Sequence, residues 1–310
     1  ILIFYSRKYF IPKINLIIKL TDQLKQFFSK LLPSIFSSGV MQINILVGTI
    51  IASFQSSAVS YLYYADRIYQ LPLAISGIAI GTVVLPVLTK TILNESKEKV
   101  FFIQNRSIEL SVFLSAPAAV GIIVGAEEII SCLFGYGSFN ENSVLNTAKA
   151  LVIFGFGLPA FSLLKLYSNF YFARGDTKFP FKVSVFTVLL NILISVIFFK
   201  QFGFLSIAAG TTISCWVATF IYKYNLKIDN FHTSDRIFLE RFAKIFACSL
   251  IMGSLLYYQF FYFEDYFNKR DLIKVLYLFF IVGNSIFVYF IMSVLFKAFS
   301  IKDFKLKNYR

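Results

Sequence analysis

One uncharged stretch decides the class of this protein: Val275–Phe296, which reads VLYLFFIVGNSIFVYFIMSVLF. Two more stretches, Gln201–Tyr222 and Ile245–Phe263, also contain no Asp, Glu, Lys or Arg. Each has about the ~20 residues that an α-helix needs to cross roughly 30 Å of hydrocarbon. A membrane β-barrel would show alternating segments of about 10 residues instead. The three stretches therefore predict transmembrane helices.

The composition of the whole chain supports the same class. Of its 310 residues, 57% are hydrophobic and 15% are charged, whereas a soluble domain carries about 25% charged residues. We therefore expect an all-α fold, a polytopic membrane helix bundle with about eight transmembrane helices. The expected spans are Ser34–Ser53, Val59–Leu88, Ser107–Phe134, Val144–Phe172, Phe181–Phe199, Phe204–Tyr222, Leu239–Tyr262 and Leu272–Phe296.

Basic residues fall unevenly on the two sides of such a bundle. The connectors of one side (7–33, 90–106, 174–182, 223–244 and 297–310) hold 23 of the 30 Lys and Arg residues, and those of the other side hold five. Basic connectors face the cytoplasm in membrane proteins. We therefore expect a cytoplasmic C-terminus, and the loop at 135–142 should face outward. This distribution accounts for the net charge of +14 without nucleic acid as a partner.

The sequence contains few of the residue patterns that are typical of an enzyme active site. Cys132, Cys215 and Cys248 lie far apart in apolar stretches, with neither metal-ligand spacing nor a disulfide framework. The lone His232 has no His or Cys neighbour. Catalytic triads, Walker loops and dinucleotide fingerprints are not found. We expect neither catalysis, nor a cofactor, nor a metal site.

Charged residues within the expected spans are the candidates for function. Asp66 and Arg67 lie in the second span, and a charge at a helix centre costs about 2.5–3.5 kcal/mol on insertion scales. Neutral polar side chains lie within one helical turn of Arg67: Tyr63, Tyr64 and Gln70. Adjacent side chains point about 100° apart, so we expect Asp66 and Arg67 to have separate partners. The alternative is a neutral pair that only holds helices together.

Pro72 follows this group and should loosen the helix, because it cannot donate a hydrogen bond to the carbonyl of Ile68.

Polar stripes mark two other spans. Ser162, Lys165 and Asn169 recur at helical spacing. In the first span, the stripe consists of Ser38, Gln42, Thr49 and Ser53. Such stripes line a cavity or join helices by hydrogen bonds. Joining helices explains Lys165 less well, although a lysine can also extend toward the membrane surface.

Two further patterns predict local environments. Glu109, Glu127 and Glu128 lie near span ends, where we expect solvation at the membrane interface. Ser206, Gly210 and Ser214 form a face of small residues, which predicts a close helix–helix contact.

Several of these residues belong to motifs that resemble the MurJ/MviN family of lipid II flippases. The motifs are QINILV at 42–47, YYADRIYQLP at 63–72, GIAIGTVVLP at 77–86, LFGYGSF at 133–139 and FYFARGDTKFP at 170–180. The resemblance covers about residues 30–200 in sequence, and the remainder only in its helix pattern.

The resemblance implies a place within a larger architecture. The family belongs to the multidrug/oligosaccharidyl-lipid/polysaccharide exporter superfamily, with two six-helix lobes around a central cavity and two extra C-terminal helices. By that pattern, residues 1–10 end a truncated transmembrane helix and residues 11–33 form a cytoplasmic amphipathic connector. Residues 34–225 form the second six-helix lobe, and residues 226–310 form the two additional helices and a basic tail. Because the chain begins with Ile1, we expect it to be the C-terminal part of a longer protein.

The resemblance also implies a function, which is transport of the undecaprenyl-pyrophosphate-linked peptidoglycan precursor (lipid II) across the inner membrane by alternating access. Arg67 would be a cavity arginine needed for transport, with Asp66 beside it. The other candidates for the substrate-binding surface are Lys165, Tyr63, Tyr64, Gln70 and Gln42. Partners would be lipid II and membrane lipids, with cell-wall synthesis proteins as further candidates. The family's other cavity arginines lie in its first helices, which this chain lacks.

Two alternatives remain at this point. The chain could belong to a sister exporter of other polyprenyl-linked glycans or of small cations, although the motif at 63–72 weighs against this. It could also be a membrane scaffold that recruits cell-wall enzymes without transporting anything. Dispensable Asp66, Arg67 and Lys165 would favour the scaffold.

Overall fold

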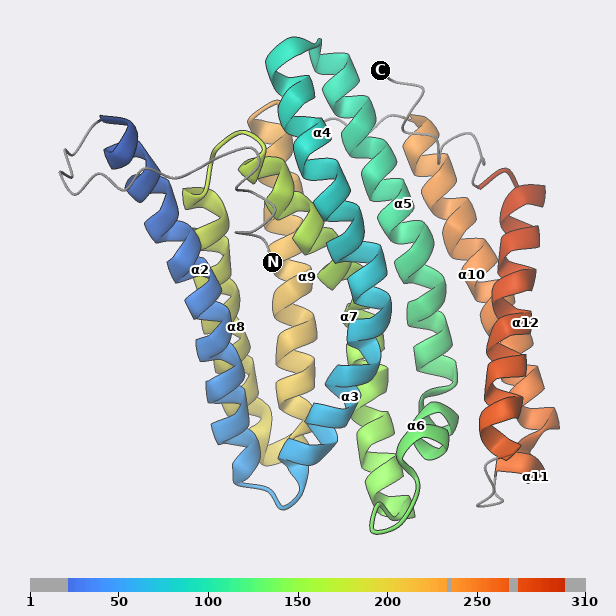
Figure 1. The fold of residues 1–310 in the computed structure, drawn as a ribbon. Helices are drawn as coiled ribbons and strands as arrows, with labels where there is room; N and C mark the ends of the chain where they lie inside the picture. The colour runs from blue at the N-terminus through green and yellow to red at the C-terminus, as the bar shows by residue number, and fades with distance from the viewer. Residues whose placement is uncertain (1–21, 233–235, 268–272, 299–310) are drawn as a thin grey trace, which may run out of the picture.

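The uncharged stretches form long helices packed into one bundle (Figure 1). The structure is a computed structural model that describes residues 22–232, 236–267 and 273–298. Its helices are α2 (Asp22–Ser53), α3 (Ala58–Leu73), η1 (Ala74–Ala79), α4 (Ile80–Asn94), α5 (Lys97–Val124), α6 (Ala126–Phe134), α7 (Glu141–Phe172), α8 (Lys178–Phe202), α9 (Leu205–Ile228), α10 (Arg236–Tyr262), α11 (Glu264–Phe267) and α12 (Ile273–Leu295). The expected truncated helix at residues 1–10, most of the basic tail and residues 11–21 of the expected connector lie outside the described residues.

Seven helical runs of the described residues are long and apolar enough to cross a membrane, and α2 adds a shorter apolar segment at Gln42–Ser53. This confirms the expected all-α bundle with about eight spans. Apolar side chains cover its outer surface, as a helix in lipid requires. On α12, for example, Leu276 and Phe279 are each 70% exposed, whereas Ile281 is completely buried.

The helices are arranged as a row of packed pairs (Figure 1). α2 packs against α8 at one edge, α10 packs against α12 at the other, and α5, α7 and α9 connect them. The connectors after α4, α7 and α9 lie at the end drawn at the top of Figure 1, and those after α2, α6 and α8 lie at the opposite end. This arrangement matches the sorting of connectors by basic charge. We call the end with the connectors after α4, α7 and α9 the basic end.

Three helix boundaries differ from the expected spans. α2 begins at Asp22, so residues 22–33 continue into the first span as one helix. α5 begins at Lys97, which leaves only a short turn within the expected connector at 90–106. The expected span Ser107–Phe134 is wrong at its end, because α5 stops at Val124 and α6 starts at Ala126. The break falls at Gly125, where a Cβ atom would lie 2.5 Å from the ring of Phe260.

The second span contains a π-helix. α3 and α4 form one helical run with the π-helix η1, which begins two residues after Pro72. The Ser76 hydroxyl shares a buried 2.7 Å hydrogen bond with the Ser162 hydroxyl of α7. At Gly77, a Cβ atom would lie 3.1 Å from the Ser162 Cα. The expected loosening at Pro72 therefore coincides with a π-helical segment packed closely on α7.

The small-residue face of α9 makes the expected close contact. At Gly210, a Cβ atom would lie 2.5 Å from the Asn191 Oδ1 of α8 and 2.9 Å from the Asn191 backbone oxygen. The Ser206 hydroxyl donates to the Ser195 carbonyl oxygen at 3.0 Å. Asn191 also donates to the Asn44 Oδ1 of α2 at 2.8 Å, so buried polar groups join three helices here.

Glu109 corrects an expectation. Instead of being solvated at the interface, its side chain is buried and pairs with Arg106 and with Arg241, whose Nη1 lies 3.1 Å from the Glu109 Oε2. Arg241 belongs to α10, far along the chain, so this contact ties α10 to α5. This pairing could not be predicted from the sequence, because the partner comes from a distant connector.

Candidate functional site

Arg67 lies on the exposed face of α3, within a helix able to span the membrane. Its Nη1 donates to the Gln70 Oε1 at 3.3 Å, and its guanidinium carbon lies 4.6 Å from the centre of the Tyr63 ring. The described residues contain no ion-pair partner for Arg67. Two neutral groups therefore hold the guanidinium and leave its positive charge uncompensated by direct pairing.

The amide of Gln70 connects Arg67 to its sequence neighbour. The Gln70 Nε2 donates to the Asp66 carboxylate while its Oε1 accepts from Arg67. The expectation of separate partners for Asp66 and Arg67 is therefore wrong, because one amide carries both a donor and an acceptor. The carboxylate and the guanidinium are bridged rather than joined directly.

Tyr69 is a residue that sequence reasoning missed. Its hydroxyl lies close enough to Asp66 to interact with it electrostatically. Its ring packs against Phe154 and Phe161 of α7, with centroid separations of 4.9 and 5.2 Å. Spacing offered a signal, since Tyr69 follows Asp66 by three positions, on the same helical face. Tyr69 thus connects the polar group on α3 to the interior of the bundle.

Tyr64 lies apart from this group. Its ring packs against Phe134 and Phe139, at centroid separations of 4.7 and 5.3 Å, on the α6 end and the loop that follows. It also meets Tyr63 edge to face at 5.8 Å. Of the two tyrosines proposed for the site, Tyr63 contacts Arg67 directly, whereas Tyr64 contacts the ring of Tyr63.

The polar stripe of α7 divides into packing and exposed parts. Ser162 bonds to Ser76 of η1, and Asn169 packs so closely on α4 that a Cβ atom at Gly81 would lie 2.3 Å from its Nδ2. These two residues join helices. Lys165 lies between them in sequence but is exposed, and no hydrogen bond or ion pair is found for it among the described residues.

Gln42 is also exposed, on α2. In the same stripe, Thr49 and Ser53 bond to carbonyl groups of their own helix, which satisfies them without a partner helix. The structure thus brings Arg67, Asp66, Gln70 and Tyr63 into one connected group. It places Lys165 and Gln42 on exposed surfaces of two other helices.

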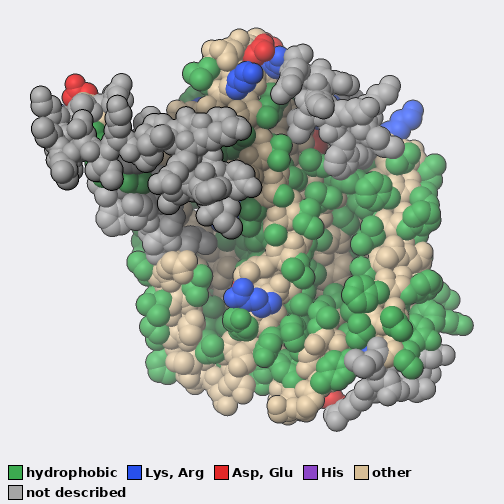
Figure 2. Space-filling model, in the orientation of Figure 1, with side chains coloured by type: hydrophobic (Ala, Val, Ile, Leu, Met, Phe, Trp, Pro, Cys, Tyr) green, Lys and Arg blue, Asp and Glu red, His purple; other side chains and the backbone are tan. Residues whose placement is uncertain are grey.

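The surface around these residues is mainly apolar. Near Arg67 in the helix, Leu71 and Ile75 are exposed apolar residues, and Figure 2 shows that hydrophobic side chains make up much of one face of the molecule. Within the described part of the chain, no group of three or more His, Cys, Asp or Glu side chains is placed to hold a metal ion. The Arg67 group can attract an anionic group electrostatically and donate hydrogen bonds to it, in surroundings of low polarity.

Comparison with known proteins decides the family. The family model described as "Lipid II flippase MurJ" matches residues 1–278. The chain belongs to this family. Among curated members, the probable lipid II flippase of Rickettsia prowazekii (strain Madrid E) is 34% identical over 254 residues, which cover 81% of this chain and 50% of the relative. That of Rhizobium meliloti (strain 1021) is 36% identical over 239 residues, covering 77% and 45%. The chain thus spans about half the length of these family members.

Solved structures agree with this assignment. A lipid II flippase MurJ in an inward closed conformation matches with a TM-score of 0.71 and 27% identity, covering 95% of this chain and 59% of that one. A MOP superfamily transporter from Pyrococcus furiosus matches with a TM-score of 0.56 and 16% identity, which shows a shared fold only. The MurJ family fold therefore extends over nearly the whole chain.

Proposed function

We propose that this chain forms the second lobe and the two C-terminal helices of a lipid II flippase in the inner membrane. In this proposal, Arg67 faces the central cavity and contacts the pyrophosphate of the undecaprenyl-linked precursor. The single observation that carries it is the state of Arg67, which is exposed, is held by neutral groups and lacks an ion-pair partner among the described residues. Membership of the flippase family supports the choice of substrate.

The physical argument for this role begins with the free-energy cost of placing a charge within the membrane. A charged side chain within a membrane span is disfavoured unless it faces a polar interior or a watery cavity. Gln70 and Tyr63 orient the guanidinium without neutralising it, because an amide oxygen and a ring face carry no net charge. A guanidinium presents a planar fork of donors that matches phosphate oxygens. Arg67 is therefore ready to bind an anionic headgroup.

Alternating access completes the proposal. An anion bound at Arg67 would be released when the cavity opens to the other side of the membrane and water competes for the phosphate oxygens. Lys165 and Gln42 would line the same pathway from α7 and α2, since both side chains are exposed. The transporter lobe would thus act by binding and reorientation, without covalent chemistry.

Complementation of a flippase-depleted strain tests the proposal. In the protein at its natural length, Arg67→Ala should abolish growth, and Arg67→Lys should rescue only in part, because an ammonium lacks the planar fork. Gln42→Ala serves as a milder comparison on the same pathway, and membrane levels of each variant are compared by immunoblotting. Full growth with well-expressed Arg67→Ala would refute the substrate contact and favour a scaffold instead.

A further inference from the structure

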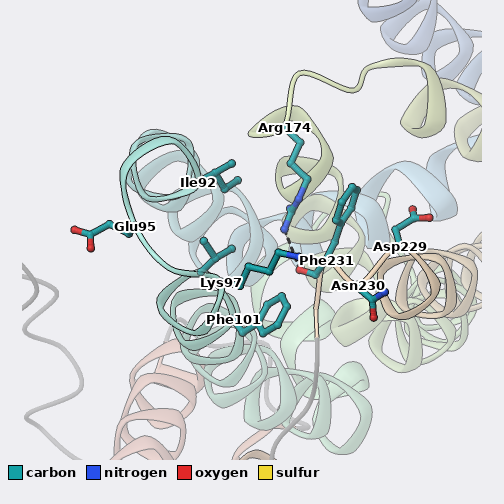
Figure 3. Close-up of a pocket in the computed structure, with 9 residues that line it drawn as sticks. Ile92, Glu95, Lys97, Phe101, Arg174, Asp229, Asn230 and Phe231 are labelled. Carbon is teal, nitrogen blue, oxygen red and sulfur yellow. Dashed lines mark hydrogen bonds between the residues drawn. The ribbon is translucent and has the colours of Figure 1, made fainter.

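A second polar region lies at the basic end, away from the Arg67 group. There, a cavity of about 210 Å³ opens between the start of α5, the connector after α7 and the connector after α9 (Figure 3). Ile92, Val100, Phe101 and Phe231 give it apolar walls. Lys97 and Arg174 add basic side chains, and Glu95 and Asp229 add acidic ones at its edge. The cavity is large enough for one small polar group with an apolar attachment.

The basic side chains point inward and the acidic ones point away. In Figure 3, Lys97 and Arg174 approach the Phe231 carbonyl from two sides, whereas the carboxylates of Glu95 and Asp229 point away from the centre. Glu95 is moreover paired with Lys99, at 2.8 Å between Nζ and Oε1. The centre of the cavity therefore has a net positive character.

Arg174 is fixed in place by neutral acceptors. It donates to the Phe170 carbonyl at 2.7 Å and to the Phe231 carbonyl at 2.9 Å, and its guanidinium lies 4.3 Å from the centre of the Phe231 ring. Burial lowers the pKa of Arg174 to about 10, which still leaves the guanidinium protonated at neutral pH. The described residues contain no ion-pair partner for Arg174 or for Lys97. Both charges thus remain available to an anion.

We propose that this cavity binds the phosphate group of an anionic phospholipid from the adjacent membrane leaflet. The cavity combines two inward-pointing cations with apolar walls, and a lipid headgroup joins a phosphate to apolar chains in the same way. The N-terminus of α5, which begins at Lys97, adds partial positive charge on the same side. The site is separate from the Arg67 group and does not depend on the proposed transport function.

Native mass spectrometry of the protein at its natural length, purified in detergent, measures lipid retention directly. Phosphatidylglycerol should be retained in preference to phosphatidylcholine. Lys97→Gln and Arg174→Gln should each lower phosphatidylglycerol retention about fivefold, the effect of one basic side chain near an anionic headgroup. Lys97→Arg should keep most of the retention. Arg174 also donates hydrogen bonds to two carbonyl groups, so its replacement can disturb the local structure. Lys97 is exposed, so its replacement should leave the fold intact.

Matched controls separate this site from general surface charge and from the transport site. Lys178→Gln removes an exposed basic residue close to Arg174 in sequence that does not line the cavity, and it should leave retention unchanged. Arg67→Ala should also leave it unchanged, whatever its effect on transport. Wild-type retention in Lys97→Gln and Arg174→Gln would overturn the site. Displacement of the lipid by millimolar inorganic phosphate would overturn the lipid as its ligand and assign free phosphate instead.

Discussion

At the scale of single residues, Glu109 is a charged side chain with a structural role away from the site. It is the buried carboxylate between Arg106 and Arg241. Glu109→Gln would remove the carboxylate charge that Arg106 and Arg241 share, and each arginine side chain is only about a fifth exposed. Removing one partner of a buried ion pair costs on the order of 3–5 kcal/mol. We expect a clear fall in the thermal unfolding temperature in detergent.

The control for this prediction is the surface pair Glu95–Lys99, whose side chains are 44% and 33% exposed. Exposed pairs contribute about 0–1 kcal/mol, so Lys99→Gln should hardly change the unfolding temperature. An equal, small effect of both variants would show that Glu109 does not tie α10 to α5.

Glu128 of α6 gives a pH-dependent prediction. Burial raises the pKa of Glu128 above its ordinary value of 4.5, and the nearby carboxylates of Glu127 and Glu264 raise it further. The folded protein therefore binds the proton more tightly than the unfolded chain does. The contribution of Glu128 to the free energy of unfolding is therefore fully present below pH 4.5. It is lost as the pH rises through the raised pKa.

Glu128→Gln should accordingly raise the unfolding temperature relative to wild type at pH 7.5, and the difference should shrink toward pH 4.5. Unfolding curves of both proteins over this range provide the measurement. A difference that stays constant with pH would contradict the assigned cause.

For the candidate site, the sequence predicted a polar group around Arg67 but not how its members pair. Arg67, Asp66, Tyr63 and Gln70 were found by their depth in a span and their helical spacing. The bridge through Gln70 was missed, because spacing does not say whether an amide turns its oxygen or its nitrogen toward a neighbour. Tyr64 satisfied the same spacing, yet its ring packs on Phe134 and Phe139, which only tertiary structure reveals.

At the scale of the helices, the contact between α8 and α9 depends on one glycine. Gly210→Ala would place a methyl group 2.5–2.9 Å from three atoms of Asn191 and Ser195, one of them a backbone oxygen that cannot turn away. Overpacking of this kind costs about 1–3 kcal/mol. We expect a lower unfolding temperature in detergent.

Gly283 of α12 is the matched control, because no atom lies within 4 Å of a Cβ built there. Gly283→Ala should be neutral or stabilising, since Ala is favoured over Gly in a helix by about 1 kcal/mol. If Gly210→Ala were as well tolerated as Gly283→Ala, the close contact between α8 and α9 would be disproved.

The sequence predicted which long helices are present better than it predicted where each helix begins and ends. Long, mainly apolar stretches located the long spans, because lipid leaves no alternative for the backbone. The ends depend on local contacts that hydropathy does not record. α5 stops where Gly125 lets the Phe260 ring approach, and the charged residues after Lys97 simply continue α5.

At the scale of the whole molecule, the asymmetry of basic residues predicts which end faces the cytoplasm. Single cysteines at Lys97 and Asn142 lie at opposite ends of the bundle. After Cys132, Cys215 and Cys248 are replaced by serine, an impermeant thiol reagent on intact cells should label the Asn142 cysteine and spare the one at Lys97. Stronger labelling at Lys97 would invert the orientation.

Membrane permeabilisation is the control, since it should make the Lys97 cysteine reactive without changing labelling at Asn142. The alternation of connectors between the two ends was predictable from the sequence, and the structure has it. The tie between Glu109 and Arg241 was not, because it joins residues from distant connectors.

The π-helix η1 has a consequence for how family members should vary in length. A turn with π-helical hydrogen bonds spans one residue more than an α-helical turn. Removing one exposed residue there, such as Ile75 or Ile78, would restore α-helical bonding and leave α3 and α4 in place. Single-residue gaps between homologous sequences should therefore collect at Ala74–Ala79, and a chain that carries such a gap should have one uninterrupted α-helix in this span.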